Sequence, residues 1–531
     1  MKKNRILAIF CTLMLTLTLG LTVLTGCAGS GVTFVYNDGK TEDTKVAAQQ
    51  GTVTLPEDPT LENFSFKGWY TEKDGKGERI TSDTRIAGNM TAYAYFEPYV
   101  DMTNRNIIEI GGYNGVTEER VDKTTGQTVY AQEKDFALLA ELGVDIIYLT
   151  YQKSEVYDSY LDWMDKYGIQ AYIRDVELNE KLQTLTENLN FDDETAVAAA
   201  IEEIKPLVER YQDRSFFRGN FLVDEPAPEQ LDMYGKCSRL YREAFPGYFM
   251  YVNLLANYYE SFEQESDFQA YVDKAVSLFG MPSVEQDHYP IHTRSTGSGL
   301  ERYVEAGDYY QGVYYPATVA RDTGKDYGNY IWTIKNLIGP ENREYAPSVT
   351  DLRFEAFNSM ALGASKINLF CASTPPSSIG AGQAVIDQSN KTEGLWDNVV
   401  QVISEVKSLS SVFNRYLWQD AACCYTGNGY GGSMILALKG SYKDKIHTMS
   451  SDTDLMVGIF EEANGDGCAF MLVNNGIITD ESDSTVKFGI NGALSVQAYV
   501  GTQSSALTKG EDGLYTLTLA PGQGAFITVE M

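Results

Sequence analysis

Two adjacent carboxylates at the end of an apolar run are the residues of this chain best suited to chemistry. The segment Gly219–Pro226 reads Gly-Asn-Phe-Leu-Val-Asp-Glu-Pro, which predicts a buried strand that ends in Asp224 and Glu225. Pro226 cannot donate to a neighbouring strand, so the strand stops there. Because successive strand residues face opposite sides, Glu225, the carboxylate nearer the opening, is the better candidate for a catalytic acid. Capping of the following helix is the alternative role.

The elements that must position these carboxylates alternate between strands and helices from about residue 102 to residue 412. Because parallel strands need crossover helices of the length found here, this alternation predicts a (β/α)8 barrel. An open doubly wound sheet is the alternative, although no glycine-rich phosphate loop follows the first strand. The eight expected strands are Asn106–Ile110, Val144–Thr150, Gln170–Asp175, Gly219–Glu225, Tyr248–Leu254, Ser283–Pro290, Asn329–Ile334 and Lys366–Phe370.

Polar and aromatic side chains gather at the ends of these expected strands. In a barrel the carboxyl ends of all strands meet at one mouth, so the side chains there share one site. Aromatic faces pack against the apolar face of a pyranose, and carboxylates and amides bind its hydroxyls, so this composition predicts a carbohydrate substrate. The candidate substrate contacts are Glu109, Tyr113, Asp175, Asp224, Asn253, Glu285, His288, Tyr289 and Trp332.

The histidines do not indicate a metal site. His288 follows an acid at an aromatic strand end, a setting more typical of a hydrogen-bonding residue than of a metal ligand. The other histidines, His292 and His447, complete no ligand spacing. A G-x-S-x-G nucleophile elbow is also missing from the sequence. We therefore expect neither a metal nor another cofactor.

Three short motifs give the barrel segment a family likeness. Asp224-Glu225-Pro226 on the fourth strand, Asn253-Leu254 on the fifth and Asp287-His288-Tyr289-Pro290 on the sixth resemble those of clan A glycoside hydrolase barrels and their relatives in gut bacteria. The resemblance implies that Glu225 is the general acid/base, a role that needs a raised pKa.

The chain departs from that family at the seventh strand. Clan A enzymes carry their nucleophilic Glu at its end, whereas Asn329–Leu337 contains no acid. Hydrolysis of a glycosidic bond needs two carboxylates, so the second must come from elsewhere. Asp287 is the first choice for this catalytic role and Glu285 the second.

Residues 1–27 form a targeting segment rather than part of the fold. A basic start with Lys2, Lys3 and Arg5 precedes the apolar run Ile6–Val23, and Leu24-Thr25-Gly26-Cys27 closes it. This ending resembles the lipobox of bacterial lipoproteins, which implies lipidation of Cys27 and a membrane-anchored protein on the extracellular face of the bacterial cell membrane. An ordinary secretory signal and an uncleaved membrane helix are the alternatives.

Residues 31–98 form a small β-rich unit. Val32–Tyr36 and Thr91–Phe96 alternate in hydrophobicity, and Phe64–Tyr70 lies between them. The V-x-F start, the central F-x-G-W-Y and the Y-A-Y-F end resemble the internalin-type B-repeat, also called the Listeria–Bacteroides repeat. The resemblance implies a β-grasp-like module, which we interpret as a spacer with Trp69 in its core. Binding of a sugar or a protein partner is the alternative.

Residues 416–531 lose the helical period and return to short β runs. Antiparallel strands joined by hairpin turns are expected, and they predict a β-sandwich. The segment resembles the accessory sandwich that follows many glycosidase barrels, and a packing role is expected. The expected strands are Met434–Leu438, Leu455–Phe460, Ala469–Asn474, Leu514–Leu519 and Ala525–Val529.

Length and charge limit the classes of function. A chain of 531 residues with 43% hydrophobic content holds several cores. Its 73 acidic and 42 basic residues give a net charge of −31, which argues against a nucleic-acid partner because the phosphate backbone would be repelled. The sequence thus predicts a cell-surface glycoside hydrolase, with a non-catalytic glycan-binding lipoprotein as the alternative.

Overall fold

The computed structural model describes residues 30–100, 107–116, 119–121, 125–151, 153–296, 299–338, 343–375, 382–428, 440–478 and 482–531. Cys27 and the expected strand Met434–Leu438 lie outside these residues. The chain divides into two compact units: one runs up to Tyr99 and includes Asn464–Asp466, and the other contains Val100–Ala463 and Gly467–Met531. None of the described helices has the length and apolarity of a membrane span.

The first unit is a five-stranded sheet built around one tryptophan. Trp69 is 1% exposed, and its ring meets those of Phe34 and Tyr36 edge to face at 4.9 and 5.1 Å. The Trp of the F-x-G-W-Y motif is therefore a core residue. The strands, in the order β2-β1-β5-β3-β4, are β1 (Gly31–Val35), β2 (Thr44–Ala47), β3 (Phe64–Tyr70), β4 (Arg79–Ile80) and β5 (Asn89–Pro98), with β1 parallel to β5.

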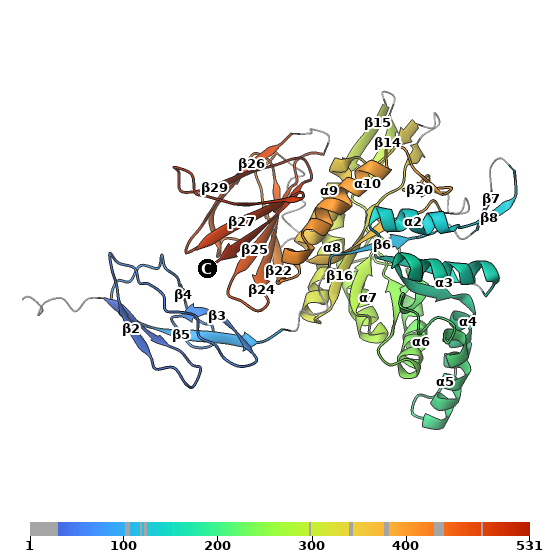
Figure 1. The fold of residues 1–531 in the computed structure, drawn as a ribbon, viewed down its shortest axis with the longest axis horizontal. Helices are drawn as coiled ribbons and strands as arrows, with labels where there is room; N and C mark the ends of the chain where they lie inside the picture. The colour runs from blue at the N-terminus through green and yellow to red at the C-terminus, as the bar shows by residue number, and fades with distance from the viewer. Residues whose placement is uncertain are drawn as a thin grey trace, which may run out of the picture. The chain divides into compact units, whose positions relative to one another are not determined.

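The second unit begins with a parallel eight-stranded barrel, which confirms the predicted fold class (Figure 1). The strands pair in the order β12-β11-β10-β9-β6-β19-β16-β13, and a parallel bridge between Leu254 and Gln286 joins the two end strands. They are β6 (Glu109–Tyr113), β9 (Ile146–Tyr151), β10 (Gln170–Asp175), β11 (Phe217–Asp224), β12 (Phe249–Asn253), β13 (Ser283–Gln286), β16 (Asp326–Trp332) and β19 (Ala364–Phe370).

Helices connect these strands, and left-handed glycines end three of them. Gly143, Gly168 and Gly280 have positive φ directly after α2, α3 and α7, where a residue without a Cβ turns the chain back toward the sheet. The helices are α2 (Glu133–Leu142), α3 (Glu155–Tyr167), α4 (Val176–Thr186), α5 (Glu194–Val208), α6 (Leu231–Ala244), α7 (Glu265–Phe279), α8 (Ala306–Asp322), α9 (Val349–Ala361), α10 (Trp396–Ser408) and the short α11 (Ser410–Phe413).

The first barrel strand lies three residues later than its expected position at Asn106–Ile110. It runs from Glu109 to Tyr113 and includes Gly111 and Gly112, which in sequence look like a strand end. Gly111 is needed because a Cβ there would overlap Oδ1 of Asn368 on the neighbouring β19. Glu109 therefore begins the strand instead of following it, and it lies at the end of the barrel opposite the mouth.

Two hairpins extend the mouth of the barrel. β14 (Ile291–Thr296) pairs with β15 (Gly299–Val304) after the sixth barrel strand, and β17 (Asn336–Ile338) pairs with β18 (Arg343–Tyr345) after the seventh. Figure 1 shows β14 and β15 reaching away from the barrel strands. The sequence did not predict these hairpins.

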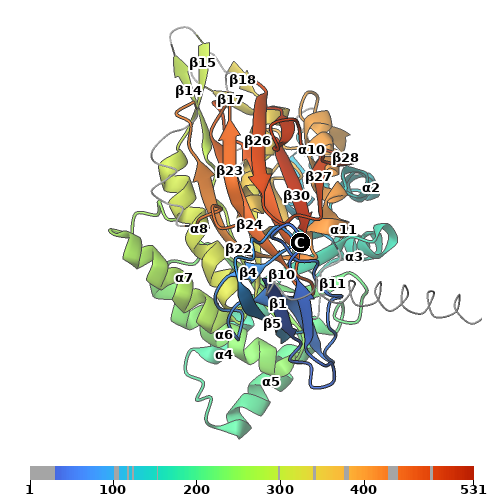
Figure 2. The same cartoon turned by 90° about the vertical axis from the view of Figure 1, so that its left-hand side faces the viewer.

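The second unit ends in two antiparallel sheets that share an apolar core, as predicted (Figure 2). Val457 and Phe470 from one sheet pack with Phe488 and Leu519 from the other. The larger sheet contains β22 (Tyr416–Cys424), β24 (Leu455–Glu462), β25 (Cys468–Asn474), β30 (Gly524–Glu530), β27 (Ser495–Val500) and β28 (Gln503–Ala506); the smaller contains β23 (Ile446–Ser451), β26 (Ser484–Ile490) and β29 (Tyr515–Leu519).

Helix α9 packs between the barrel and this sandwich. Its Asn358 is fully buried and donates to Oδ1 of Asn475 in the sandwich at 2.9 Å. Nε1 of Trp418, on β22, donates to the carbonyl of Ala361 at the end of α9 at 3.0 Å. A Cβ at Gly458 of β24 would overlap the same carbonyl, so the sheet approaches the helix closely. Barrel and sandwich therefore share one continuous packed region.

Candidate active site

Three carboxylates meet where the fourth, fifth and sixth barrel strands end. Asp224 is the last residue of β11, Glu225 follows it, and Asp287 follows β13. Asn253 ends β12 between them, and its Nδ2 donates to Oδ1 of Asp224 at 3.1 Å and to Oδ1 of Asp287 at 3.3 Å. One amide thus holds together carboxylates from two strand ends.

The backbone of Glu225 allows two adjacent carboxylates to face one site. Glu225 has φ +48°, a left-handed conformation that is rare for a residue with a side chain. A register shift between Phe221 and Val223 bends β11 just before it, and the amide of Glu225 donates to the carbonyl of Asn253 at 2.9 Å. The bend and the turn together overcome the strand alternation that would send Asp224 and Glu225 to opposite faces.

Glu225 and Asp287 share a hydrogen bond, and we call them the carboxyl pair. Glu225 lies on an exposed turn, but its carboxyl faces Asp287. Desolvation, followed by the charges of Asp287 and Asp224, raises the pKa of Glu225 to about 8. Burial raises the pKa of Asp287 to about 6, against the lowering effect of its hydrogen bonds to Glu225 and Asn253. At neutral pH the proton resides on Glu225, and Asp287 is ionised.

Tyr113 fixes the third carboxylate. It ends β6, and its hydroxyl donates to Oδ2 of Asp224 at 2.5 Å. Burial, together with the charge of Asp224, raises the pKa of Tyr113 well above its usual range, so the phenol remains a donor. Asp224 is thus held by Tyr113 on one oxygen and by Asn253 on the other.

Aromatic rings surround the carboxyl pair. The hydroxyl of Tyr289 lies 3.4 Å from Oδ2 of Asp287, and its ring meets Trp332 edge to face at 5.2 Å. Tyr258, in the loop after β12, is 60% exposed. Burial of its hydroxyl and the nearby charges of Asp287 and Glu225 raise the pKa of Tyr258 to about 12. The mouth therefore offers both charged groups and ring faces.

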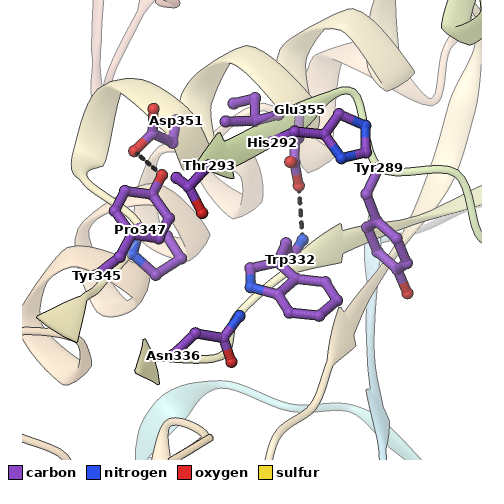
Figure 3. Close-up of a pocket in the computed structure, with 10 residues that line it drawn as sticks. Tyr289, His292, Thr293, Trp332, Asn336, Tyr345, Pro347, Asp351 and Glu355 are labelled. Carbon is purple, nitrogen blue, oxygen red and sulfur yellow. Dashed lines mark hydrogen bonds between the residues drawn. The ribbon is translucent and has the colours of Figure 1, made fainter. Parts of the chain in front are cut away.

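A pocket of about 250 Å³ is lined in part by Tyr289 (Figure 3), the residue whose hydroxyl approaches Asp287. Tyr289 and Trp332 are among its lining residues, and helix α9 contributes Glu355. We call it the hairpin pocket, because β14, β17 and β18 provide much of its wall. It is lined by Tyr289, Ile291, His292, Thr293, Trp332, Asn336, Tyr345, Pro347, Asp351 and Glu355.

Glu109 and Glu285 lie inside the barrel, away from the mouth. Nζ of Lys366 binds Glu109 at 2.9 Å, and Arg218 lies 3.2 Å from its other oxygen. Glu285 is 1% exposed and accepts hydrogen bonds from Tyr148, Tyr251, Asn368 and Ser283. Both carboxylates are occupied by protein partners, so the expectation that they contact substrate is corrected to a role in the barrel interior.

Asp175 and His288 face outward, toward the helices. Asp175 is fully buried, caps α4 through the amide of Leu178, and pairs with Arg210. His288 is 3% exposed and binds Oδ1 of Asn257 through Nε2 at 2.8 Å. Side chains alternate along the chain at strand ends, so the neighbours of inward residues point out. These two expected substrate contacts are therefore not part of the mouth.

Three residues at or near the site were missed. Arg174 precedes Asp175 on the inner face, with its guanidinium 5.4 Å from the ring centre of Phe221; alternation from the inward Tyr172 would have indicated it. Tyr258 lies in a loop, and Glu355 lies in a helix, so neither belongs to a strand end that sequence could mark. In the described part of the chain, no His, Cys, Asp and Glu cluster has the arrangement of a metal site.

One domain family matches the N-terminal unit, and several solved structures are similar to larger parts of the chain. Residues 31–95 match the Listeria-Bacteroides repeat domain, which confirms the resemblance of the N-terminal unit. Three similar structures are glycoside hydrolases. The β-galactosidase from Bacillus circulans sp. alkalophilus has 10% identity and a TM-score of 0.46, over 81% of this chain and 100% of that chain.

The other two belong to glycoside hydrolase family 5. The one from Bacteroides vulgatus ATCC 8482 has 11% identity and a TM-score of 0.42, over 87% of this chain and 93% of that chain. The mannosidase from Rhizomucor miehei has 14% identity and a TM-score of 0.38, over 66% of this chain and 99% of that chain. Each is a protein to which this chain is similar.

Proposed function

We propose that this protein is a glycoside hydrolase that cleaves O-glycosidic bonds, with Glu225 as proton donor and Asp287 as the second carboxylate. The observation that carries the proposal is the carboxyl pair at the barrel mouth. Its surroundings raise the pKa of Glu225 to about 8 and that of Asp287 to about 6. One protonated and one ionised carboxyl at neutral pH is the combination that acid/base cleavage of a glycosidic bond requires.

The two carboxyls have distinct tasks in the reaction. Glu225 gives its proton to the glycosidic oxygen as the bond from that oxygen to the anomeric carbon breaks. Asp287 either attacks the anomeric carbon or takes a proton from the attacking water. Tyr113 and Asn253 keep Asp224 in place beside them, so its charge favours the proton on Glu225.

The substrate must separate the pair before cleavage. Catalytic carboxyls lie about 5–5.5 Å apart in retaining glycosidases and about 6.5–9.5 Å apart in inverting ones. Glu225 and Asp287 are hydrogen-bonded to each other, which is closer than either arrangement. Glu225 lies on an exposed turn after β11, so its side chain has room to swing toward a glycosidic oxygen placed between the two groups.

The second candidate function is glycan binding without cleavage. Two observations favour it: the seventh strand ends at Trp332 without an acid, and the hydrogen bond within the carboxyl pair closes the gap that a reacting bond would occupy. The ring faces of Tyr258 and Trp332 would serve a binding protein equally well.

A glycan panel tests both functions. Wild type, Glu225→Gln and Asp287→Asn are assayed on natural oligosaccharides and on aryl glycosides with activated leaving groups. Glu225→Gln should lose about 100- to 10,000-fold on natural glycans and much less on the aryl substrates, because an activated phenol leaves without a proton. Asp287→Asn should impair both. Glu229→Gln, an exposed carboxylate four residues after Glu225, is the matched control.

The outcomes separate the proposals. A wild type that binds glycans but cleaves none supports the binding protein. Full activity in Glu225→Gln would show that another residue donates the proton.

We further propose that Cys27 is lipidated and holds the protein on the extracellular face of the bacterial cell membrane. The support is the sequence Leu24-Thr25-Gly26-Cys27 after an apolar run with a basic start. Mass spectrometry of membrane-extracted protein should find acyl chains on Cys27, and Cys27→Ser should move the protein out of the membrane fraction. An unmodified Cys27 in the membrane fraction would overturn this proposal.

A further inference from the structure

The hairpin pocket has the size of a single sugar unit. Its volume of about 250 Å³ is below the roughly 300–1,000 Å³ typical of pockets for drug-sized ligands. Tyr289 lies on one side of the pocket, and Tyr345 and Pro347 lie on the other (Figure 3). Tyr289 lines the pocket and its hydroxyl lies 3.4 Å from Oδ2 of Asp287, so a sugar bound here would lie next to the carboxyl pair.

Glu355 is a buried carboxyl beside which the described residues place no positive charge. It is 2% exposed, and the backbone amide of Trp332 donates to its Oε2 at 2.6 Å (Figure 3). None of the described lysines, arginines and histidines forms an ion pair with it. Burial, with a further contribution from Asp351, raises the pKa of Glu355 well above its usual range. These surroundings therefore favour the protonated form of the carboxyl.

The other charged groups of the pocket have partners. Asp351 is also 2% exposed, but Nη1 of Arg302 binds it at 2.9 Å and the hydroxyl of Tyr345 donates to it at 2.8 Å. His292 lines the pocket, and its Nε2 lies 3.7 Å from Oε2 of Glu305, a residue that is not part of the lining. Among the described lining residues, Glu355 is thus the acid that a ligand cation would neutralise.

The walls suit a cation as well as a sugar ring. Aromatic faces attract an ammonium group through their negative ring faces, and they pack against the apolar face of a pyranose. A neutral sugar would leave Glu355 protonated and offer it only an ordinary hydrogen bond. An ammonium group would replace the proton on Glu355 with a charge-assisted hydrogen bond, which is roughly twice as strong.

We infer that the hairpin pocket binds a sugar with a free amino group, and that Glu355 is the counter-ion of its ammonium. The assignment to a sugar rests on the proposed function, because it places the pocket beside the carboxyl pair. The presence of an ammonium site rests on Glu355 and the aromatic walls alone. The substrate class that follows is an amino sugar whose nitrogen is not acetylated.

Calorimetric titration of the full chain tests this inference with D-glucosamine, D-glucose and N-acetyl-D-glucosamine at pH 6. Glucosamine should bind wild type about 10- to 100-fold more tightly than the other two, in line with a charged hydrogen bond. Binding should also release a proton from Glu355, so the measured heat should change between buffers of different ionisation enthalpy. Glu355→Gln should lose both the preference and the proton release, since Gln keeps the acceptor for Trp332 but not the charge.

Two further variants provide a control and a test of the aromatic wall. Glu344→Gln removes an exposed carboxylate of β18 that pairs with Lys335, and it should bind glucosamine as wild type does. Trp332→Leu should lower the affinity for glucosamine, because the pocket loses an aromatic ring face. Equal affinities for glucose and glucosamine, or a preference that survives in Glu355→Gln, would overturn the inference. n-Butylamine that binds as tightly as glucosamine would overturn the sugar assignment.

Wild type measured in both this titration and the glycan panel separates this inference from the proposed function. A wild type that binds glucosamine selectively but cleaves no glycan would refute hydrolysis and leave the ammonium site standing. An active hydrolase that binds glucose and glucosamine equally would refute the ammonium site alone.

Discussion

At the residue scale, Glu225 reaches the mouth through its own backbone conformation. Its φ of +48° costs on the order of 1 kcal/mol or more in a residue with a side chain. The hydrogen bonds around it, from its amide to Asn253 and from its carboxyl to Asp287, hold it there. Strain of this kind gathers at functional sites, and here it brings two adjacent acids to one place.

The carboxyl pair predicts the pH dependence of hydrolysis. The donor must be protonated and its partner ionised, so kcat/KM should rise as the pH passes about 6 and fall as it passes about 8, with a maximum near 7. The profile is measured on a natural oligosaccharide and on an activated aryl glycoside. With the aryl glycoside, the fall of kcat/KM above about pH 8 should be smaller than with the natural oligosaccharide. A rate that still rises above pH 9 would contradict the role of Glu225.

The same pair predicts how stability changes with pH. Folding raises the pKa of Glu225 from 4.5 to about 8, so as the pH rises the unfolded state loses its proton first. The stability of the wild type should therefore decrease between about pH 4.5 and pH 8 through this group. Glu225→Gln lacks the titration, so its Tm relative to wild type should rise over that range. A constant Tm difference from pH 4.5 to pH 9 would exclude the raised pKa.

Sequence alone marked the strand ends but not the direction of each side chain there. Asp224, Glu225, Asn253 and Asp287 come together as their positions suggested. Asp175 also lies at a strand end, but half of all strand residues point toward the helices, and Asp175 is one of them. Only the bend in β11 and the turn at Glu225 decide which acids face inward, and neither leaves a pattern in the sequence.

At the element scale, the sequence predicts the eight-fold alternation of strands and helices. It does not predict the register of the first strand. Gly111 and Gly112 interrupt the apolar run, so the strand seemed to end at Ile110, whereas β6 begins at Glu109. The glycine at 111 makes room for Asn368, whose side chain binds both Glu285 and Tyr148. A contact between the first and eighth strands cannot be recognised from either strand alone.

Gly111→Ala tests this close approach. The added methyl would overlap Asn368, which is held by its hydrogen bonds and cannot move freely, so unfolding free energy should fall by about 1–3 kcal/mol. Denaturation in urea measures the loss. Gly510→Ala, in an exposed turn of the same compact unit, should change stability by about 0.5 kcal/mol or less. Equal stability of Gly111→Ala and wild type would show that the barrel tolerates a Cβ there.

The hairpins after the sixth and seventh strands carry the pocket that sequence missed. The segment Ile291–Thr296 is mostly polar and shows no hydrophobic alternation, so it does not predict a strand. Glu355 lies 23 residues after Trp332 in the chain but beside its amide in space. Long-range proximity of this kind follows from the fold and not from local pattern.

At the scale of the whole molecule, barrel and sandwich belong to one compact unit. The ring of Phe413 meets that of Phe526 at 5.2 Å, and the hydroxyl of Tyr314 on α8 donates to Asp420 of β22 at 2.6 Å. We expect limited proteolysis to release no stable barrel that ends near Asn414. A protease-resistant fragment with that end would contradict the shared packing, and the fragment masses decide the question.

The N-terminal repeat should be dispensable for folding. It has its own core around Trp69, and the compact units divide after Tyr99. A chain that starts at Asp101 should therefore unfold cooperatively, with a Tm close to that of the barrel and sandwich in the full protein. Insolubility, or a broad transition without cooperativity in calorimetry, would show that the boundary is misplaced.

Helix α9 links the evolution of the sandwich to that of the pocket. One side of this helix places Glu355 beside Trp332, and another places Asn358 against Asn475. A recombination event that exchanged the sandwich for a different accessory domain would leave Asn358 without its partner and shift the helix that bears Glu355. Barrel and sandwich are therefore expected to be inherited together, and relatives that lack this sandwich are expected to have a different pocket.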